Sequence, residues 1–226
     1  MRLTLRAITG LALALAVFIG AAPQPAAAAS WSGSYSVYTA GSFSAQHLDY
    51  TCVGASIQMM LNMQRHQTDH SVKNQNAYWR YGNEHNRYFA SNHGVDPQGW
   101  VASLEHFGAG NYSISLATRF QSALKVIAAR MRSSGKAVGL LVHHGGHAWV
   151  MTGFAATADP ATTDNYRVTS VQVMGPLYPN GTIGGKSYDP GPRTWLSLDK
   201  LRAKFTPIRW SRAREWDGRW IAIVPN

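Results

Sequence analysis

The sequence has only one cysteine, Cys52, in 226 residues, so no disulfide can form within the chain. Small exported domains often rely on several disulfides, which need cysteines in even numbers, and the single cysteine excludes such a framework. Most unpaired cysteines are buried and act as small apolar residues. An unpaired thiol can also be a nucleophile. The sequence therefore leaves two roles open for Cys52, packing or chemistry.

Acidic residues are scarce as well: 11 Asp and Glu stand against 21 Lys and Arg, giving a formal net charge of +10. Such a surface favours acidic peptides or anionic cell-envelope polymers as partners, although positive charge also serves solubility alone. No run of five basic residues and no nucleic-acid motif occurs, so no nucleic-acid partner is expected. Hydrophobic residues make up 45% of the chain and charged residues 14%, which is typical of a globular protein.

Long apolar runs are missing beyond the first 29 residues. There, Arg2 and Arg6 precede the run "ITGLALALAVFIGAA", and small residues end at Ala29, a pattern that predicts a cleaved secretory signal peptide over 1–29. A membrane helix needs about 20 apolar residues, and no later segment approaches that length. We therefore expect a secreted protein whose mature part, residues 30–226, forms a single domain without a membrane span.

The hydrophobic pattern changes halfway along the chain, from helical spacing to short runs that are apolar on both faces. Helices are expected from about residue 52, partly over 73–90, from Pro97 to about 107 and over 119–133. Strands are expected at "AVGLLV" (137–142), "HAWVMTGFA" (147–155), "YRVTSVQVM" (166–174) and "RWIAIVP" (219–225), with a helix at 195–205 before the last. This order predicts an α+β fold, with N-terminal helices packed on a C-terminal antiparallel sheet.

Cys52 lies where the first helix of the mature chain is expected to start, with Thr51 or Asp49 as its cap. Unpaired N–H groups at a helix start favour a thiolate, and the Cys52 N–H could stabilise an oxyanion. Gln46, six residues earlier, could donate a second hydrogen bond to that oxyanion. Among nine histidines, His147 stands out as a polar residue that opens an apolar strand, and it could serve as the base.

The order of these motifs resembles the papain-like cysteine peptidases, in particular the bacterial branch of double-glycine leader peptidases that process bacteriocins. The resemblance rests on Gln46, on "CVGASIQMML" starting at Cys52 and on His147 followed by Gly153. It covers about residues 40–200 in element order. It implies a papain-like fold and a cysteine peptidase in which Cys52 attacks the acyl carbon of a peptide or protein, His147 transfers protons and Gln46 stabilises the oxyanion.

One position departs from that family. The branch usually places an Asp followed by Pro at the end of the strand after the histidine strand, where this chain has Gly175. Asp159 and Asn180 are the nearest candidates to orient His147 instead. The departure also leaves open a catalytically inactive relative that binds peptide or cell-envelope material. Hydrolysis, transpeptidation and deamidation all remain compatible with these residues.

Two other interpretations compete with the thiol site. His143, His144 and His147 could bind a metal, but Gly145 and Gly146 argue against a helix that would bring them together, and no HExxH motif is present. Eight Trp and ten Tyr could line a carbohydrate groove, although most such residues serve the core. No metal or organic cofactor is expected.

Overall fold

The computed structural model describes residues 31–89, 94–179, 182–183, 186–187 and 189–226. The expected signal peptide, residues 1–29, lies outside this range. Residues 31–226 fold as one unit. In the described part of the chain, no helix is both long and apolar enough to cross a membrane.

The α-helices of this unit form where the sequence places apolar residues at helical spacing. They are α1 (Cys52–Arg65), α2 (Val72–Glu84), α3 (Pro97–His106), α4 (Phe120–Ser134) and the short α5 (Leu198–Arg202). α3 starts at Pro97, as expected, where no N–H is needed, and the Asp96 carboxylate caps it by accepting a hydrogen bond from Gly99 N–H.

A mixed set of long and short strands forms one antiparallel sheet of seven strands. Its strands are β1 (Ser34–Ser36), β2 (Tyr112–Ala117), β3 (Val138–Val142), β4 (His147–Ala156), β5 (Val168–Met174), β8 (Thr194–Ser197) and β9 (Trp220–Pro225). The order along the sheet is β2-β9-β3-β4-β5-β8. Two further strands, β6 (Thr182–Ile183) and β7 (Lys186–Ser187), pair only with each other.

The longest strand, β4, organises the sheet. Its first half pairs with β3, from Val138 opposite Met151 to Val142 opposite His147, and β5 pairs along its other edge. β1 pairs with the second half of β4, on the same edge that β3 occupies along the first half. β4 is buried along almost its whole length, as expected for a central strand with neighbours on both edges.

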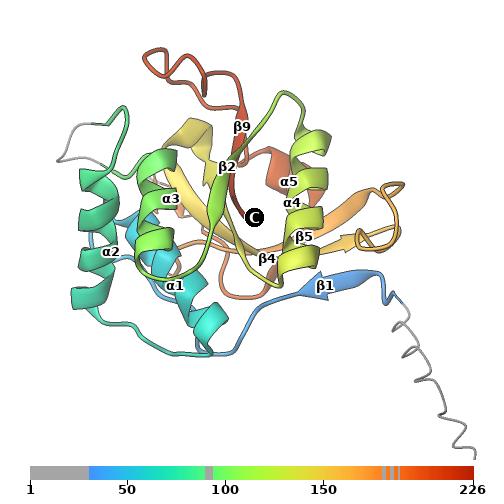
Figure 1. The fold of residues 1–226 in the computed structure, drawn as a ribbon, viewed down its shortest axis with the longest axis horizontal. Coiled ribbons are helices and arrows are strands. Elements are labelled where there is room, and N and C mark those ends of the chain that lie inside the picture. Colours follow the sequence, from blue (N-terminus) through green and yellow to red (C-terminus); the bar gives the residue numbers. More distant parts are fainter. Residues whose placement is uncertain (1–30, 90–93, 180–181, 184–185, 188) are drawn as a thin grey trace, which may run out of the picture. The chain divides into compact units, whose positions relative to one another are not determined.

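Helices cover both faces of the sheet (Figure 1). Apolar side chains of α1, α2 and α3 pack with Leu141, Val150 and Ile223 on one face. Those of α4 and α5 pack with Leu140 and Met151 on the other. Consecutive strand residues thus enter opposite cores, which explains why these strands are apolar on both faces.

The α+β class and its antiparallel sheet are confirmed, but the expected order of elements is incomplete, because β1, β2, β8 and the β6–β7 pair were not expected. β2 lies between α3 and α4, although its alternation of Tyr112, Ile114 and Leu116 with serines is typical of a strand. The helix expected over 195–205 is shorter in the structure. Its first residues belong to β8, and only Leu198–Arg202 are helical, as α5. Pairing of β8 with β5 outweighs the weak helical pattern there.

Candidate active site

Cys52 is the first residue of α1 and is half-buried and unpaired. The preceding turn is closed by Thr51, whose hydroxyl donates to the Leu48 carbonyl and accepts from the Leu48 N–H. Thr51 is at the cap position, as expected, but its side chain makes no cap hydrogen bond to the helix, and Asp49 makes none either. The first turn of α1 also contains no acidic residue, so its positive end is left for the thiol group and any oxyanion.

His147 begins β4, directly after a tight turn. The turn is the short 3₁₀ segment η1 (His143–Gly145), in which His143 and His144 have left-handed backbones with φ of 53° and 59°. Backbone hydrogen bonds hold this costly geometry: His143 N–H donates to the Lys204 carbonyl, and the His144 carbonyl accepts from Arg209 N–H. The turn therefore fixes where the imidazole enters the site.

The His147 imidazole lies between a thiol and a carboxylate. Its Nε2 is 2.8 Å from Oδ2 of Asp189, and its side chain is only 3% exposed. It also interacts with the Cys52 side chain. Since Nε2 faces Asp189, the proton of a neutral imidazole belongs on Nε2, and Nδ1 is the nitrogen available to the thiol.

Asp189 was missed by the sequence analysis. Its carboxylate is 1% exposed and accepts three hydrogen bonds: from His147, from the Leu177 backbone N–H at 2.6 Å and from the Trp149 indole N–H at 2.7 Å. A buried carboxylate is stable only when such donors satisfy it. Two of these partners hold Asp189 in place while the third, His147, is oriented by it.

Gly175, the position where the family pattern would place the acid, explains how Asp189 reaches the imidazole. A Cβ atom at Gly175 would lie 2.5 Å from both Cγ and Oδ2 of Asp189 and 2.7 Å from Nε1 of Trp149. The two segments are also joined, because Gly175 N–H donates to the Pro190 carbonyl. The Asp189 carboxylate therefore fills the space that a side chain at position 175 would occupy.

A signal for Asp189 exists in the sequence, because it is followed by Pro190. The same Asp-Pro dipeptide occurs at Asp96 and Asp159, so the pattern does not distinguish the three. Asp96 caps α3, and only the fold shows which of the three carboxylates meets the histidine.

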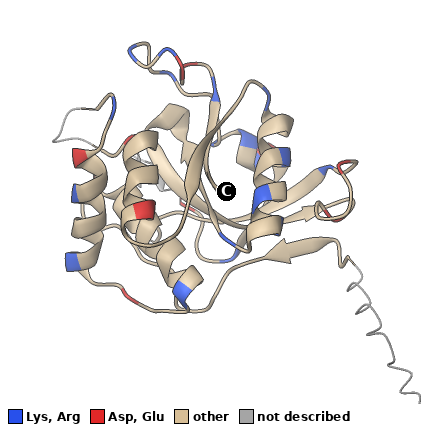
Figure 2. Ribbon diagram, in the orientation of Figure 1, with Lys and Arg blue, Asp and Glu red and all other residues tan. Residues whose placement is uncertain are grey.

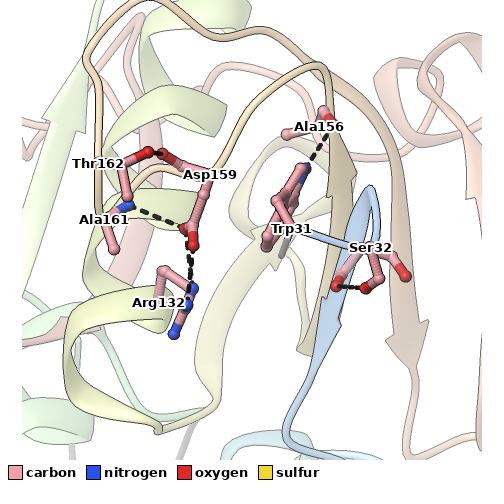
Figure 3. Close-up of polar contacts among 8 residues, drawn as sticks. Trp31, Ser32, Arg132, Ala156, Asp159, Ala161 and Thr162 are labelled. Carbon is pink, nitrogen blue, oxygen red and sulfur yellow. Dashed lines mark hydrogen bonds and ion pairs between the residues drawn. The ribbon is translucent and has the colours of Figure 1, made fainter. Parts of the chain in front are cut away.

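The expectation that Asp159 orients His147 is corrected by its contacts. Figure 3 shows its carboxylate paired with Arg132 of α4, with Nε and Nη2 of Arg132 each 2.8 Å from a carboxylate oxygen. Ala161 N–H donates to the same carboxylate. The hydrogen bond from Arg132 holds the pKa of Asp159 below its usual value. Asp159 thus joins α4 to the loop after β4. The other candidate, Asn180, lies outside the described residues.

Gln46 lies on a loop that is bonded to the segment after Gly175, since its backbone N–H donates to the Pro176 carbonyl at 2.8 Å. Its amide nitrogen Nε2 donates to the Leu48 carbonyl, which leaves one amide hydrogen for another acceptor. Its oxygen Oε1 is buried without a partner among the described residues. The loop is thus anchored beside the candidate site, while the carboxamide itself bonds within its own loop.

The electrostatic environment of His147 favours the imidazolium. Burial alone would lower its pKa, but the hydrogen bond to Asp189 and the interactions with Cys52 outweigh burial and raise the pKa to about 9. The neighbouring His143 behaves in the opposite way: burial lowers its pKa, and the positive charge of Lys204 lowers it further. Of these two histidines, His147 is the one suited to carry a proton beside a thiolate.

The three histidines considered for a metal do not converge. His144 places Nδ1 3.0 Å from the Pro207 carbonyl, and the ring of His143 lies 6.3 Å from that of His147. Within the described residues, no group of three or more His, Cys, Asp and Glu could hold a metal ion.

A cavity of about 640 Å³ opens onto Cys52 and His147. Its other lining residues come from the turn before α1, from the segments on either side of residues 90–93, from β3, β4 and the turn between them, and from the segment before β9. They include Asp49, Tyr50, Tyr88, Phe89, Val95, Gly146, Arg209, Trp210 and Arg212. The cavity has the size of a site for a small ligand or a few residues of a peptide.

No family model, curated protein or solved structure matches this chain.

Replacing Gly175 by Ala is expected to destabilise the fold by about 1–3 kcal/mol, because the added methyl group overlaps the carboxylate of Asp189 and the indole of Trp149. Urea unfolding curves of the two proteins measure the difference. Gly94→Ala is the matched control, since a Cβ there meets no atom of the described residues within 4 Å. Equal stability of the Gly175→Ala variant and the parent protein would contradict the packing described above.

Replacing Asp189 by Asn is expected to lower the pKa of His147 from about 9, because the negative charge that stabilises the imidazolium is removed. NMR titration of the histidine ring signals measures the change. Because the pKa in the folded protein lies above the ordinary value of about 6.5, the imidazolium adds stability that is complete below that pH and is lost as the pH rises through about 9.

The control for this titration is Asp159→Asn, which removes the partner of Arg132 and should leave His147 unchanged. An unchanged His147 midpoint in the Asp189→Asn protein would show that Asp189 does not govern the imidazole.

Proposed function

We propose that the protein is a cysteine peptidase or a related thiol hydrolase of peptide or amide bonds. The observation that carries the proposal is the His147 imidazole held between the Cys52 side chain and the buried Asp189 carboxylate, at the floor of an open cavity. Acyl transfer by a thiol requires a nucleophile, a base beside it and a group that orients the base. Cys52, His147 and Asp189 are suited to these three roles.

The local architecture supports a papain-like fold within the α+β class. The thiol lies on the first residue of a helix, and the histidine on the first residue of a central antiparallel strand. The helix packs against that strand through the shared core that includes Ile57 and Val150. This arrangement matches what the resemblance to papain-like peptidases implies for Cys52 and His147.

The reaction begins with transfer of the Cys52 proton to Nδ1 of His147, which gives a thiolate and an imidazolium. The thiolate sulfur attacks the carbonyl carbon, and the carbonyl oxygen becomes an oxyanion near the start of α1. The Cys52 N–H and the remaining amide hydrogen of Gln46 stabilise this oxyanion. The C–N bond then breaks as His147 gives its proton to the leaving nitrogen, so that a thioester and a free amine form.

Water completes the cycle. His147, now neutral, takes a proton from a water molecule as the water oxygen attacks the thioester carbon. The C–S bond breaks, the carboxylic acid product leaves, and the Cys52 thiolate and the imidazolium are restored. Asp189 accepts the Nε2 hydrogen bond throughout and keeps Nδ1 directed toward the sulfur.

The inactive alternative depended on the absence of an acid at position 175. Asp189 occupies the space beside that glycine and contacts the imidazole, so Gly175 no longer argues against catalysis. We also propose export, because the pattern over residues 1–29 is that of a secretory signal peptide. The single cysteine is then explained as the reagent of the enzyme.

The first test is alkylation of Cys52 by iodoacetamide across the pH range, measured by mass spectrometry. An ordinary thiol has a pKa of about 8.5 and reacts slowly at pH 6. We expect rapid labelling of the parent protein at pH 6, and loss of that reactivity in His147→Ala, because the imidazole no longer accepts the proton. His85→Ala, which changes a histidine at the end of α2, should label like the parent. Slow labelling at pH 6 in all three proteins would argue against the proposal.

A second test concerns Gln46. Removing an oxyanion donor typically lowers kcat by about 10²–10³-fold. We expect a loss of this order in Gln46→Ala, with Cys52 labelling unchanged because the amide acts on the transition state and not on the thiol. Gln67→Ala, an exposed glutamine just beyond α1, is the control. Full activity in the Gln46→Ala protein would remove this residue from the mechanism.

A further inference from the structure

One wall of the cavity is basic. The basic residues come from residues 207–219, the later part of the segment between α5 and β9, which we call the 207–219 loop (Figure 1). Arg209, Trp210 and Arg212 of this loop line the same cavity as Cys52 and His147. Figure 2 shows where Lys and Arg lie along this loop. The loop is absent from the motifs that led to the proposed function.

The 207–219 loop is held in place by its own hydrogen bonds. Ile208 N–H donates to the Arg219 carbonyl at 2.9 Å, and Gly218 N–H donates back to the Ile208 carbonyl at 2.9 Å. Trp210 N–H donates to the Asp217 carboxylate, and Arg209 N–H donates to the His144 carbonyl in the turn before His147. The loop is therefore fastened to the turn that positions the catalytic histidine.

Packing adds to this fixation. Trp216 is 2% exposed and lies at the base of the loop with its ring 6.0 Å from that of Trp210. Trp210 in turn lies against Gly145, where a Cβ atom would come within 2.7 Å of the indole and where φ is +89°. The arginines on either side of Trp210 thus project from a fixed backbone, which lowers the entropic cost of placing them around a ligand.

The two arginines have no anionic partner in the described part of the protein. Their guanidinium groups make no ion pair or hydrogen bond there, whereas Arg87 is paired with Glu215 and Arg132 with Asp159. Asp217 of the same loop already accepts the Trp210 N–H. Asp49 is the only acidic residue among the described residues that line the cavity.

Two like charges on one wall repel each other, and an anion bound between them relieves that repulsion. A guanidinium binds a carboxylate through two parallel hydrogen bonds, a geometry that ammonium groups do not offer. Both arginines are exposed, so their guanidinium groups are free to reach a ligand that enters the cavity.

We propose that Arg209 and Arg212 form a subsite for the carboxylate of an Asp or Glu side chain close to the scissile bond, so that the enzyme prefers acidic peptides. This inference rests on the proposed function for its chemistry, while the binding preference itself depends only on the cavity.

The test uses two matched libraries of internally quenched peptides, identical except that each scanned position holds either Glu or Gln, and all amidated at the C-terminus. We expect kcat/KM to favour Glu by about fivefold at one position next to the cleaved bond, the upper end of what one exposed ion pair contributes. The preference should fall toward unity in Arg209→Gln/Arg212→Gln, through loss of rate on the Glu peptides alone. It should also weaken in high salt.

Arg214→Gln is the matched control, because Arg214 is exposed on the same loop but does not line the cavity. It should keep the preference of the parent. Equal rates on Glu and Gln peptides, or a preference that survives the double substitution, would overturn the inference.

Binding separates this inference from the proposed function. The Cys52→Ala protein cannot form a thioester, so fluorescence polarisation of the same peptides on it measures recognition alone. Tighter binding of Glu peptides that is lost in the double arginine variant supports the subsite even if the parent protein cleaves nothing, an outcome that would contradict only the catalytic proposal. Equal binding of both peptide sets overturns the subsite even if Cys52 reacts rapidly at pH 6.

Discussion

The site depends on one buried carboxylate. Asp189 is almost fully removed from water, and an isolated charge there would be strongly unfavourable. Hydrogen bonds from His147, Trp149 and Leu177 compensate for the lost hydration and fix the carboxylate in one position. The position and protonation of the imidazole follow from it, and with them the environment of the Cys52 thiol.

The absence of a side chain at Gly175 makes that carboxylate possible. A Cβ atom at this position would overlap the Asp189 carboxylate, so the missing side chain leaves the space in which Asp189 meets His147. The Gly175–Pro190 backbone hydrogen bond brings the two segments together. What matters to His147 is the location of a charge relative to Nε2, and the chain can meet that requirement from more than one sequence position.

The cavity is likewise assembled from distant parts of the chain. The turn before α1 brings Cys52, the β3–β4 turn brings His147, and the 207–219 loop brings the arginines. The hydrogen bond from Arg209 N–H to the His144 carbonyl joins the last two, so the basic wall is connected to the turn that positions His147.

The sequence by itself determined the α+β class, most helices and the central strands. It also supplied the hypothesis that Cys52, at the start of a helix, acts together with His147, at the start of a strand. These are local properties, because hydrophobic spacing and polar residues at element ends are readable within short windows. Only the tertiary structure decided which of three Asp-Pro dipeptides meets the histidine, because that contact joins β4 to a segment 42 residues away. Pairing across such distances depends on sheet order and on the space left at Gly175, neither of which is encoded locally.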